Sequence, residues 1–152
     1  MDVLYVYSGR VILKKLILSF LLVACSGSAI ADSGLSSSAP GSKVYVISPQ
    51  GGETVSSPVL VRFGLSGMGV APSGVVRVNT GHHHLLIDMK VLPDLKQPLV
   101  GSDNLRHFGK GQTEAELMLS PGEHTLQLVL ADHAHTPHSS PLVSERITIH
   151  VK

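Results

Sequence analysis

Histidine is the residue type in this sequence best suited to chemistry, and all nine histidines lie after residue 81. Most of them fall into three groups: the triple His82–His84, the segment around His107, and the run Asp132–His138. Neutral imidazole is a good ligand for zinc, copper and nickel. Because no cysteine follows residue 25, these groups contain no thiolate, and copper(II) or zinc fits them better than iron–sulfur chemistry.

The triple histidine lies in a segment with strand character, residues 81–89. In a strand, residues i and i+2 project to the same face. His82 and His84 therefore point together as a chelating pair, whereas His83 shares its side with Leu85 and is expected to be a packed core histidine. The plainer interpretation of the triple is a polar strand face.

The same rule pairs His133 with His135, provided that a strand continues past Ala131. Proline favours a turn, so Pro137 can fold His138 back toward this pair. Two same-face pairs from neighbouring strands would supply the three or four ligands that a zinc or copper site needs. The plainer interpretation is a solvated loop, because an isolated histidine-rich tract is only a compositional hint.

The rest of the sequence contains no recognisable catalytic motif. No Gly-x-Ser-x-Gly motif presents a nucleophile. Glu114 and Glu116 share a strand face, and Glu114 would be the base of a metal-assisted hydrolase, but solvated carboxylates are commoner on strands. An enzyme is therefore the least favoured class, and whether the protein is one stays open.

Residues 1–31 have the features of a signal peptide, which directs a protein out of the cytoplasm. Lys14 and Lys15 are positively charged, Leu16–Ala24 is apolar, and Ala29–Ala31 fits a signal-peptidase site. The apolar run is far shorter than the roughly 20 residues that cross a bilayer. We therefore expect a cleaved signal peptide and a periplasmic location.

Cys25 leaves a second possibility open. Leu22–Cys25 resembles a lipobox, in which the cysteine is lipid-modified and becomes the new N-terminus. Cleavage after Ala31 is the slightly favoured alternative, and it leaves a mature domain without any thiol. Membrane association is expected only if the chain is lipid-anchored through Cys25.

Charge argues against one class of partner. After residue 31 the chain has nine basic and ten acidic residues, a formal charge near −1 with neutral histidines. Proteins that bind nucleic acid neutralise phosphates with clustered Lys and Arg. No basic stripe is present here, so nucleic acid is not an expected partner.

The remaining sequence predicts short strands. Residues 32–42 are rich in Ser, Gly and Pro and are expected to form a flexible tether. Strands are expected within a domain at residues 43–152, and the ranges are 43–47, 58–65, 81–89, 112–119, 124–131 and 143–151. A hairpin turn is expected at Ser120–Glu123 and a loop at residues 90–111. This pattern is typical of an all-β fold, a small immunoglobulin-like antiparallel β-sandwich, with a small barrel as the alternative.

Several segments together resemble the bacterial domain of unknown function 4399 family. These segments are Ser48–Gly52, Gly81–Asp88, His107–Glu114, Pro121–Leu128 and Asp132–His138. The resemblance implies an exported domain and brings no established activity. The histidines inside the resembling segments are the preferred metal-site residues: His82, His84, His107, His133, His135 and His138.

Two functions from different classes are therefore expected. The first is a periplasmic protein that binds copper or zinc and buffers, carries or delivers the ion. His82, His84, His133 and His135 are its expected ligands, with His107 or His138 completing the set. Asp88 or Asp132 would accept hydrogen bonds that orient the imidazoles. The second is a non-enzymatic module that binds another envelope protein or a polysaccharide, with histidines as pH-responsive contacts.

Overall fold

The computed structural model describes residues 6–7, 10–11 and 35–152. The chain forms two units, residues 1–31 and residues 32–152. In the first unit, β1 (Val6–Tyr7) pairs antiparallel with β2 (Arg10–Val11). The rest of the expected leader lies outside the described residues, with its cleavage site and Cys25.

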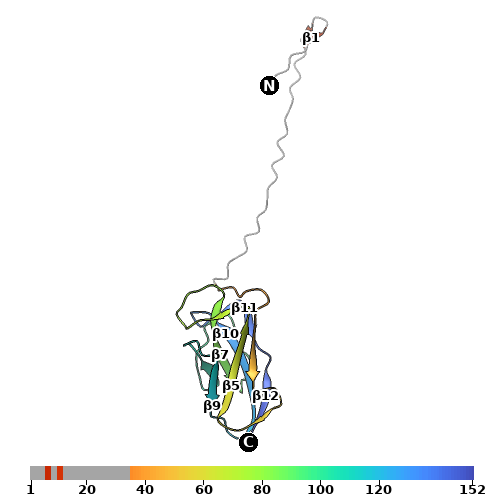
Figure 1. Ribbon diagram of the computed structural model, residues 1–152. Coiled ribbons are helices and arrows are strands. Elements are labelled where there is room, and N and C mark those ends of the chain that lie inside the picture. Colours follow the sequence, from red (N-terminus) through yellow and green to blue (C-terminus); the bar gives the residue numbers. More distant parts are fainter. Residues whose placement is uncertain (1–5, 8–9, 12–34) are drawn as a thin grey trace. The chain divides into compact units, whose positions relative to one another are not determined.

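The second unit is all-β and consists of two main sheets (Figure 1). The three-stranded sheet has the antiparallel order β3–β5–β9. The seven-stranded sheet has the order β4–β12–β10–β7–β6, with β11 beside β10 and β8 beside β7. No helix occurs among the described residues, and so none there is long and apolar enough to cross a membrane.

The strand bounds follow. The three-stranded sheet contains β3 (Lys43–Ser48), β5 (Val59–Ser66) and β9 (Glu114–Leu117). The seven-stranded sheet contains β4 (Thr54–Val55), β6 (Gly69–Val70), β7 (Thr80–Ile87), β8 (Leu105–His107), β10 (Gly122–Ala131), β11 (Pro137–Val143) and β12 (Ile147–Val151).

The main core lies between the two sheets. Alternate residues of β5, including Val61 and Phe63, are buried against Leu85 of β7 and Leu128 of β10. From Val59 to Phe63 of β5, buried and exposed side chains alternate, because successive side chains point to opposite faces. Full burial of such a side chain contributes about 2 kcal/mol. Apolar alternation therefore explains why these segments form a two-layer, sandwich-like fold.

A second apolar cluster covers the outer face of the seven-stranded sheet. Leu99 and Leu105 from the long loop pack on Leu86, Val129 and Ala131. The sequence analysis expected only a loop at residues 90–111, so β8 was missed. Because both faces of β7 are covered, all of its residues from Gly81 to Ile87 are buried.

Two sequence-based expectations are wrong. The turn Ser120–Glu123 does not form a hairpin, because β9 pairs with β5 and β10 belongs to the other sheet. The expected strand at residues 143–151 is interrupted between β11 and β12. At the interruption, the backbone N–H of Ser144 donates to Leu128 O and its hydroxyl accepts from Leu128 N–H, both at 2.9 Å.

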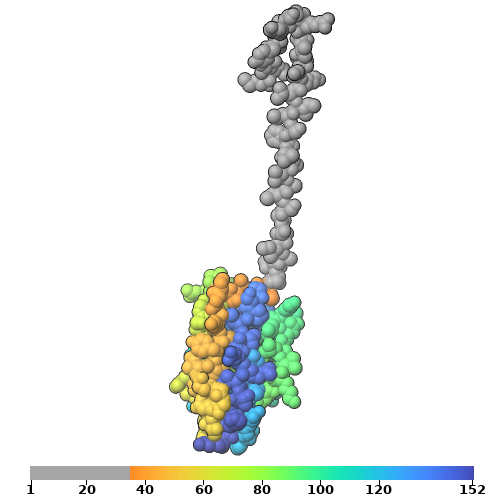
Figure 2. All heavy atoms as spheres, turned by 90° about the vertical axis from the view of Figure 1, so that its right-hand side faces the viewer, coloured from red at the N-terminus to blue at the C-terminus, as the bar shows by residue number. Residues whose placement is uncertain are grey.

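Residues 35–42, the described part of the expected tether, lie along β11. The backbone N–H of Ser139 donates to Ser36 O at 2.9 Å, and Ser38 Oγ donates to Ser140 O at 2.8 Å. Figure 2 shows this orange segment against the blue C-terminal strands. Residues 35–42 are thus joined by hydrogen bonds to β11, the strand that contains His138 of the last histidine group.

Candidate metal centre

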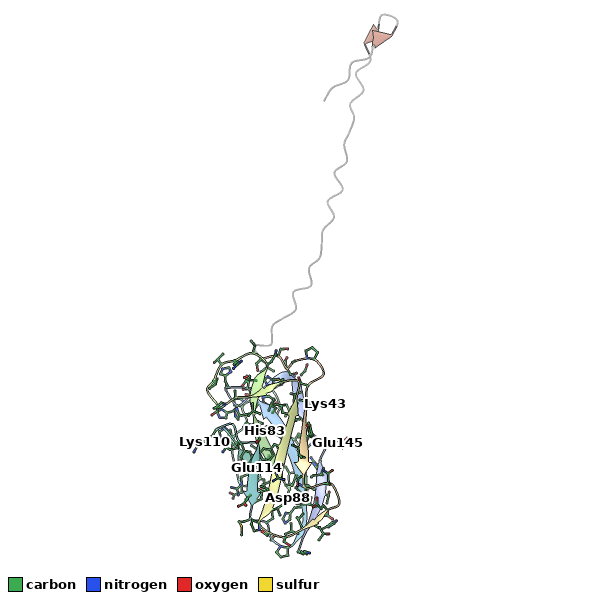
Figure 3. All side chains as sticks on the ribbon, viewed as in Figure 1. Lys43, His83, Asp88, Lys110, Glu114 and Glu145 are labelled. Carbon is green, nitrogen blue, oxygen red and sulfur yellow. The ribbon has the colours of Figure 1, made fainter. Side chains whose placement is uncertain are left out.

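His82 and His84 lie on the outer face of the seven-stranded sheet. They stand beside Ala131 and Val129 of β10, and both side chains are completely buried. Their ring centroids are 4.8 Å apart, as the strand parity predicts. His83 points the other way, into the core between the sheets, where its ring lies 5.2 Å from that of Phe63 (Figure 3).

β8 adds His107 to this pair. His107 lies directly opposite His84 in the antiparallel β7–β8 ladder. Opposite residues of such a pair share a face, so the His107 ring meets those of His84 and His82 at 5.1 and 5.0 Å. Unlike the two buried histidines, His107 is exposed. It therefore stands where the group meets solvent.

His135 completes the group from a turn at the end of β10. Its ring centroid lies 4.7 Å from that of His107, 5.1 Å from that of His82 and 6.1 Å from that of His84. We call these four residues, His82, His84, His107 and His135, the histidine cluster. The histidine cluster therefore combines residues from β7, β8 and the turn, which are distant from one another in the sequence. It lies on the outer face of a sheet.

The turn places His133 differently from the sequence-based expectation. β10 ends at Ala131, so the strand that would pair His133 with His135 does not continue. His135 has φ +66°, in the left-handed region. His133 instead lines a pocket with Asp132 and His138, away from the ring contacts of the cluster. The structure thus brings together four of the six preferred histidines and leaves His133 and His138 outside.

Within the described part of the chain, the four nitrogens of the two buried rings make no well-formed hydrogen bond, and only the backbone of His82 interacts with the His84 ring. Burial, followed by repulsion from the neighbouring imidazoles, lowers the pKa of His82 to about 4 and that of His84 to about 3. Burial and the charge of His135 also lower the pKa of His107. At neutral pH the buried rings are therefore uncharged and each offers a nitrogen lone pair.

The arrangement is suited to holding a cation. One ring nitrogen each from His82, His107 and His135 can be chosen so that all three lie within 4.8 Å of one another. The ring of His84 packs beside the other three, with centroid distances of 4.8, 5.1 and 6.1 Å, but its nitrogens are not part of this converging group. A metal ion binds neutral imidazole nitrogen, which is the form that burial favours here. These histidines form a site that can hold a metal ion.

The two aspartates expected to orient imidazoles have different roles. Asp88 binds His124, with 2.8 Å between Oδ2 and Nδ1. Asp132 caps the turn that carries His135, since its Oδ1 accepts from the backbone N–H of Ala134 at 2.9 Å. Sequence reasoning missed β8 and its register with β7. The i, i+2 spacing of Leu105 and His107 was the available signal, because it matches the face of Leu86 and His84.

Comparison with known proteins identifies a family and no function. Residues 61–152 match the family described as Domain of unknown function (DUF4399). No curated protein and no solved structure matches the chain. The match contains the whole histidine cluster and spans more than half of the chain. The protein therefore belongs to the DUF4399 family, as the resemblance of its histidine-bearing segments indicates.

Proposed function

We propose that this protein is an exported, periplasmic metal-binding protein that buffers, carries or delivers zinc or copper through its histidine cluster. The leader-like sequence of residues 1–31 supports the periplasmic location. The metal ion is the partner for which the cluster offers ligands.

The observation that carries this proposal is that His82 and His84 are buried without well-formed hydrogen bonds on their ring nitrogens in the described part of the chain. A buried polar group that lacks a partner costs about 1–3 kcal/mol. Buried polar groups in proteins are almost always paired, so each exception needs an explanation. A metal ion coordinated by these nitrogens would supply the missing partner.

The spacing of the rings supports a tetrahedral ion. Four imidazoles bound to one zinc ion at about 2.1 Å would have ring centroids about 5 Å apart in every pair. The six centroid distances of the cluster run from 4.7 to 6.1 Å, and five of them are 5.1 Å or less. Square-planar copper(II) would require two clearly longer pairs. This spacing favours zinc over copper(II), provided that His84 turns a nitrogen toward the three that already converge.

The position of the expected base argues against metal-assisted hydrolysis. A catalytic zinc keeps one position for water, and the three converging nitrogens of His82, His107 and His135 would leave such a position unless His84 also binds. The expected base, Glu114, belongs to β9 in the three-stranded sheet and pairs with Arg62 at 3.2 Å. The histidine cluster lies on the outer face of the other sheet. Binding and release of an ion suit this arrangement better than turnover.

Titration of the purified protein with zinc(II) and copper(II) tests the proposal. We expect one ion per chain, with zinc bound in tetrahedral geometry. The double variant His82→Ala/His84→Ala should lose at least 100-fold in affinity, because it removes one of the three converging nitrogens and the buried ring beside it. His150→Ala is the matched control, since His150 is an exposed histidine on β12. Unchanged affinity in the double variant would exclude the histidine cluster as the site.

A second candidate function is a module that binds another envelope protein. Val76 and Val78 are 77% and 86% exposed, and Val100 is 81% exposed. The loops that carry these valines are hydrogen-bonded to the last histidine group. Gly74 N–H donates to His133 O, and Leu99 N–H donates to His135 O. Exposed apolar side chains mark interaction surfaces when they gather. Partner binding that survives a chelator and weakens in Val76→Ser/Val78→Ser would favour this function.

A further inference from the structure

The turn that carries His135 is held by the N-terminal segment of the domain. We propose that Ser36 is a positioning residue of the metal centre, and that residues 35–42 must be docked on the turn and β11 for full metal affinity. This inference rests on the proposed metal-binding function and names what controls it. The metal site predicted from the sequence did not include residues 35–42.

The contacts of Ser36 fix its role. Its hydroxyl lies 2.8 Å from Asp132 Oδ2 and 2.8 Å from His138 Nδ1. An ionised carboxylate only accepts hydrogen bonds, so the Ser36 hydroxyl donates to Asp132 and accepts from the Nδ1–H of His138. The Ser36 carbonyl also accepts from Ser139 N–H at 2.9 Å. Three bonds therefore tie this one residue to both ends of the turn region.

Asp132 transmits this contact to the turn. Its Oδ1 accepts from the backbone N–H of Ala134 at 2.9 Å and of Thr136 at 3.0 Å. Its own carbonyl accepts from His135 N–H at 3.0 Å. These hydrogen bonds place the Asp132 side chain at the centre of the turn, where it organises the backbone on both sides of His135.

His135 depends on this support because of its backbone. A non-glycine residue at φ +66° is strained and persists only where surrounding contacts hold it. Without Ser36, the Oδ2 of Asp132 and the Nδ1 of His138 lose their partner in a buried region. The turn then samples other conformations in which His135 leaves the cluster. Apparent affinity falls in proportion to the fraction of chains that keep the binding-competent turn.

Coupling of this kind is reciprocal. If docking of the N-terminal segment raises affinity for the ion, the ion must stabilise the docked segment by the same factor. The Ser139 amide reports docking, because it donates to the Ser36 carbonyl. Zinc should therefore slow hydrogen exchange at Ser139, although this amide is not part of the metal site.

The test compares the zinc affinity of the unmodified protein with that of three variants, two of them at position 36. Ser36→Ala should bind zinc about tenfold more weakly, as is common when a group that orients a ligand is lost. Its cobalt(II) absorption spectrum should shift toward that of His135→Ala. Ser36→Thr keeps the hydroxyl and should restore both readouts. Ser57→Ala is the matched control, since the Ser57 hydroxyl accepts a hydrogen bond from Leu119 N–H at 3.2 Å and lies outside both residues 35–42 and the turn.

The outcomes separate this inference from the proposed function. If the unmodified protein binds no zinc, both fail. If it binds zinc and His135→Ala weakens binding, but Ser36→Ala equals the unmodified protein, the positioning role is overturned and the metal site stands. Should Ser36→Ala fail to fold, hydrogen exchange in the unmodified protein decides: zinc that leaves exchange at Ser139 unchanged overturns the coupling.

Discussion

Two sites in this domain surround histidine side chains with opposite environments. His124 bonds through Nδ1 to Asp88 at 2.8 Å and through Nε2 to the carbonyl of Ser120 at 2.9 Å. The histidine cluster has two buried rings whose nitrogens make no such well-formed hydrogen bonds among the described residues. Figure 3 shows His83 of the cluster-bearing strand β7 midway along the domain and Asp88 nearer the end that carries the C-terminus.

The difference extends to charge. Both nitrogens of His124 face oxygen acceptors, so its charged form is favoured, and the hydrogen bond to Asp88 is the main reason that its pKa is raised. Burial does the reverse at His82 and His84. A histidine that stabilises the fold is satisfied by the protein itself. His83 in the core also lacks a well-formed hydrogen bond on its ring nitrogens, so it is the convergence of buried His82 with His107 and His135 that points to a ligand.

Lowering the pH should produce the largest difference in stability between the two histidine environments. The pKa of His82 is about 4 and that of His84 about 3 when folded, against 6.5 when unfolded. The unfolded chain therefore binds more protons below pH 6.5, and stability falls as the pH drops toward these folded values. Each unit of difference costs about 1.4 kcal/mol. We expect the metal-free protein to unfold between pH 6.5 and 4, as followed by circular dichroism.

Zinc provides the control for the acid experiment. An ion bound only by the folded state adds stability that grows with its concentration. Saturating zinc should therefore move the acid midpoint to lower pH. An acid transition that is the same with zinc and with a chelator would contradict the assignment of these two histidines to a metal site.

Apolar replacement of the two buried rings should separate stability from binding. His82→Leu/His84→Leu removes four nitrogens that lack well-formed hydrogen bonds and replaces them with apolar surface. We expect zinc affinity to fall at least 100-fold while the metal-free protein gains about 1–2 kcal/mol, because unsatisfied buried polar groups are lost. Urea unfolding with a chelator measures the gain. A less stable double variant would indicate that the rings already stabilise the metal-free fold.

The shared face of His82 and His84 could be predicted from the sequence, whereas the positions of His107 and His135 could not. Parity within β7 correctly separated His82 and His84 from His83, because a strand's side chains alternate whatever it packs against. His107 and His135 depend on register and on a turn. β8 is only three residues long, and its pairing of His107 with His84 is set by the fold of the long loop. The all-β architecture followed from apolar alternation, whereas the pairing of β9 with β5 did not.

The turn at residues 132–136 shows why local rules failed there. Asp132 bonds to the backbone of Ala134 and Thr136, which ends β10 and separates His133 from His135. Asp is common in such turns because its side chain bonds to nearby backbone. The partner of Asp132, Ser36, is 96 residues away in sequence. A contact over that separation carries no local signal in a single sequence.

A substitution at Gly109 should have a smaller effect, and it should lower zinc affinity more than it lowers stability. A Cβ added at Gly109 would collide with the ring of His107 and approach Ser73 Oγ to 2.8 Å. The exposed His107 ring can move away, so Gly109→Ala should cost little stability but displace a ligand. We expect about tenfold weaker zinc binding by calorimetry, similar to the loss of a group that orients a ligand. Gly101→Ala is the control, because its nearest neighbour is 3.7 Å away. Equal affinity in both variants would show that His107 is not a ligand.

The smallest expected effect is at His124, which is the other side of the comparison. His124→Ala should leave zinc affinity unchanged and lower stability by about 1–2 kcal/mol at pH 6, because a charge-assisted bond to Asp88 is lost. The folded pKa of His124 lies above its unfolded value, so its contribution is complete below pH 6.5 and disappears as the pH rises through the folded pKa. The variant and the unmodified protein should therefore converge in stability at pH 9, the reverse of the trend for the cluster. Urea unfolding at both pH values measures this. A stability difference that grows with pH would mean that His124 is held neutral and that the two environments do not differ as described.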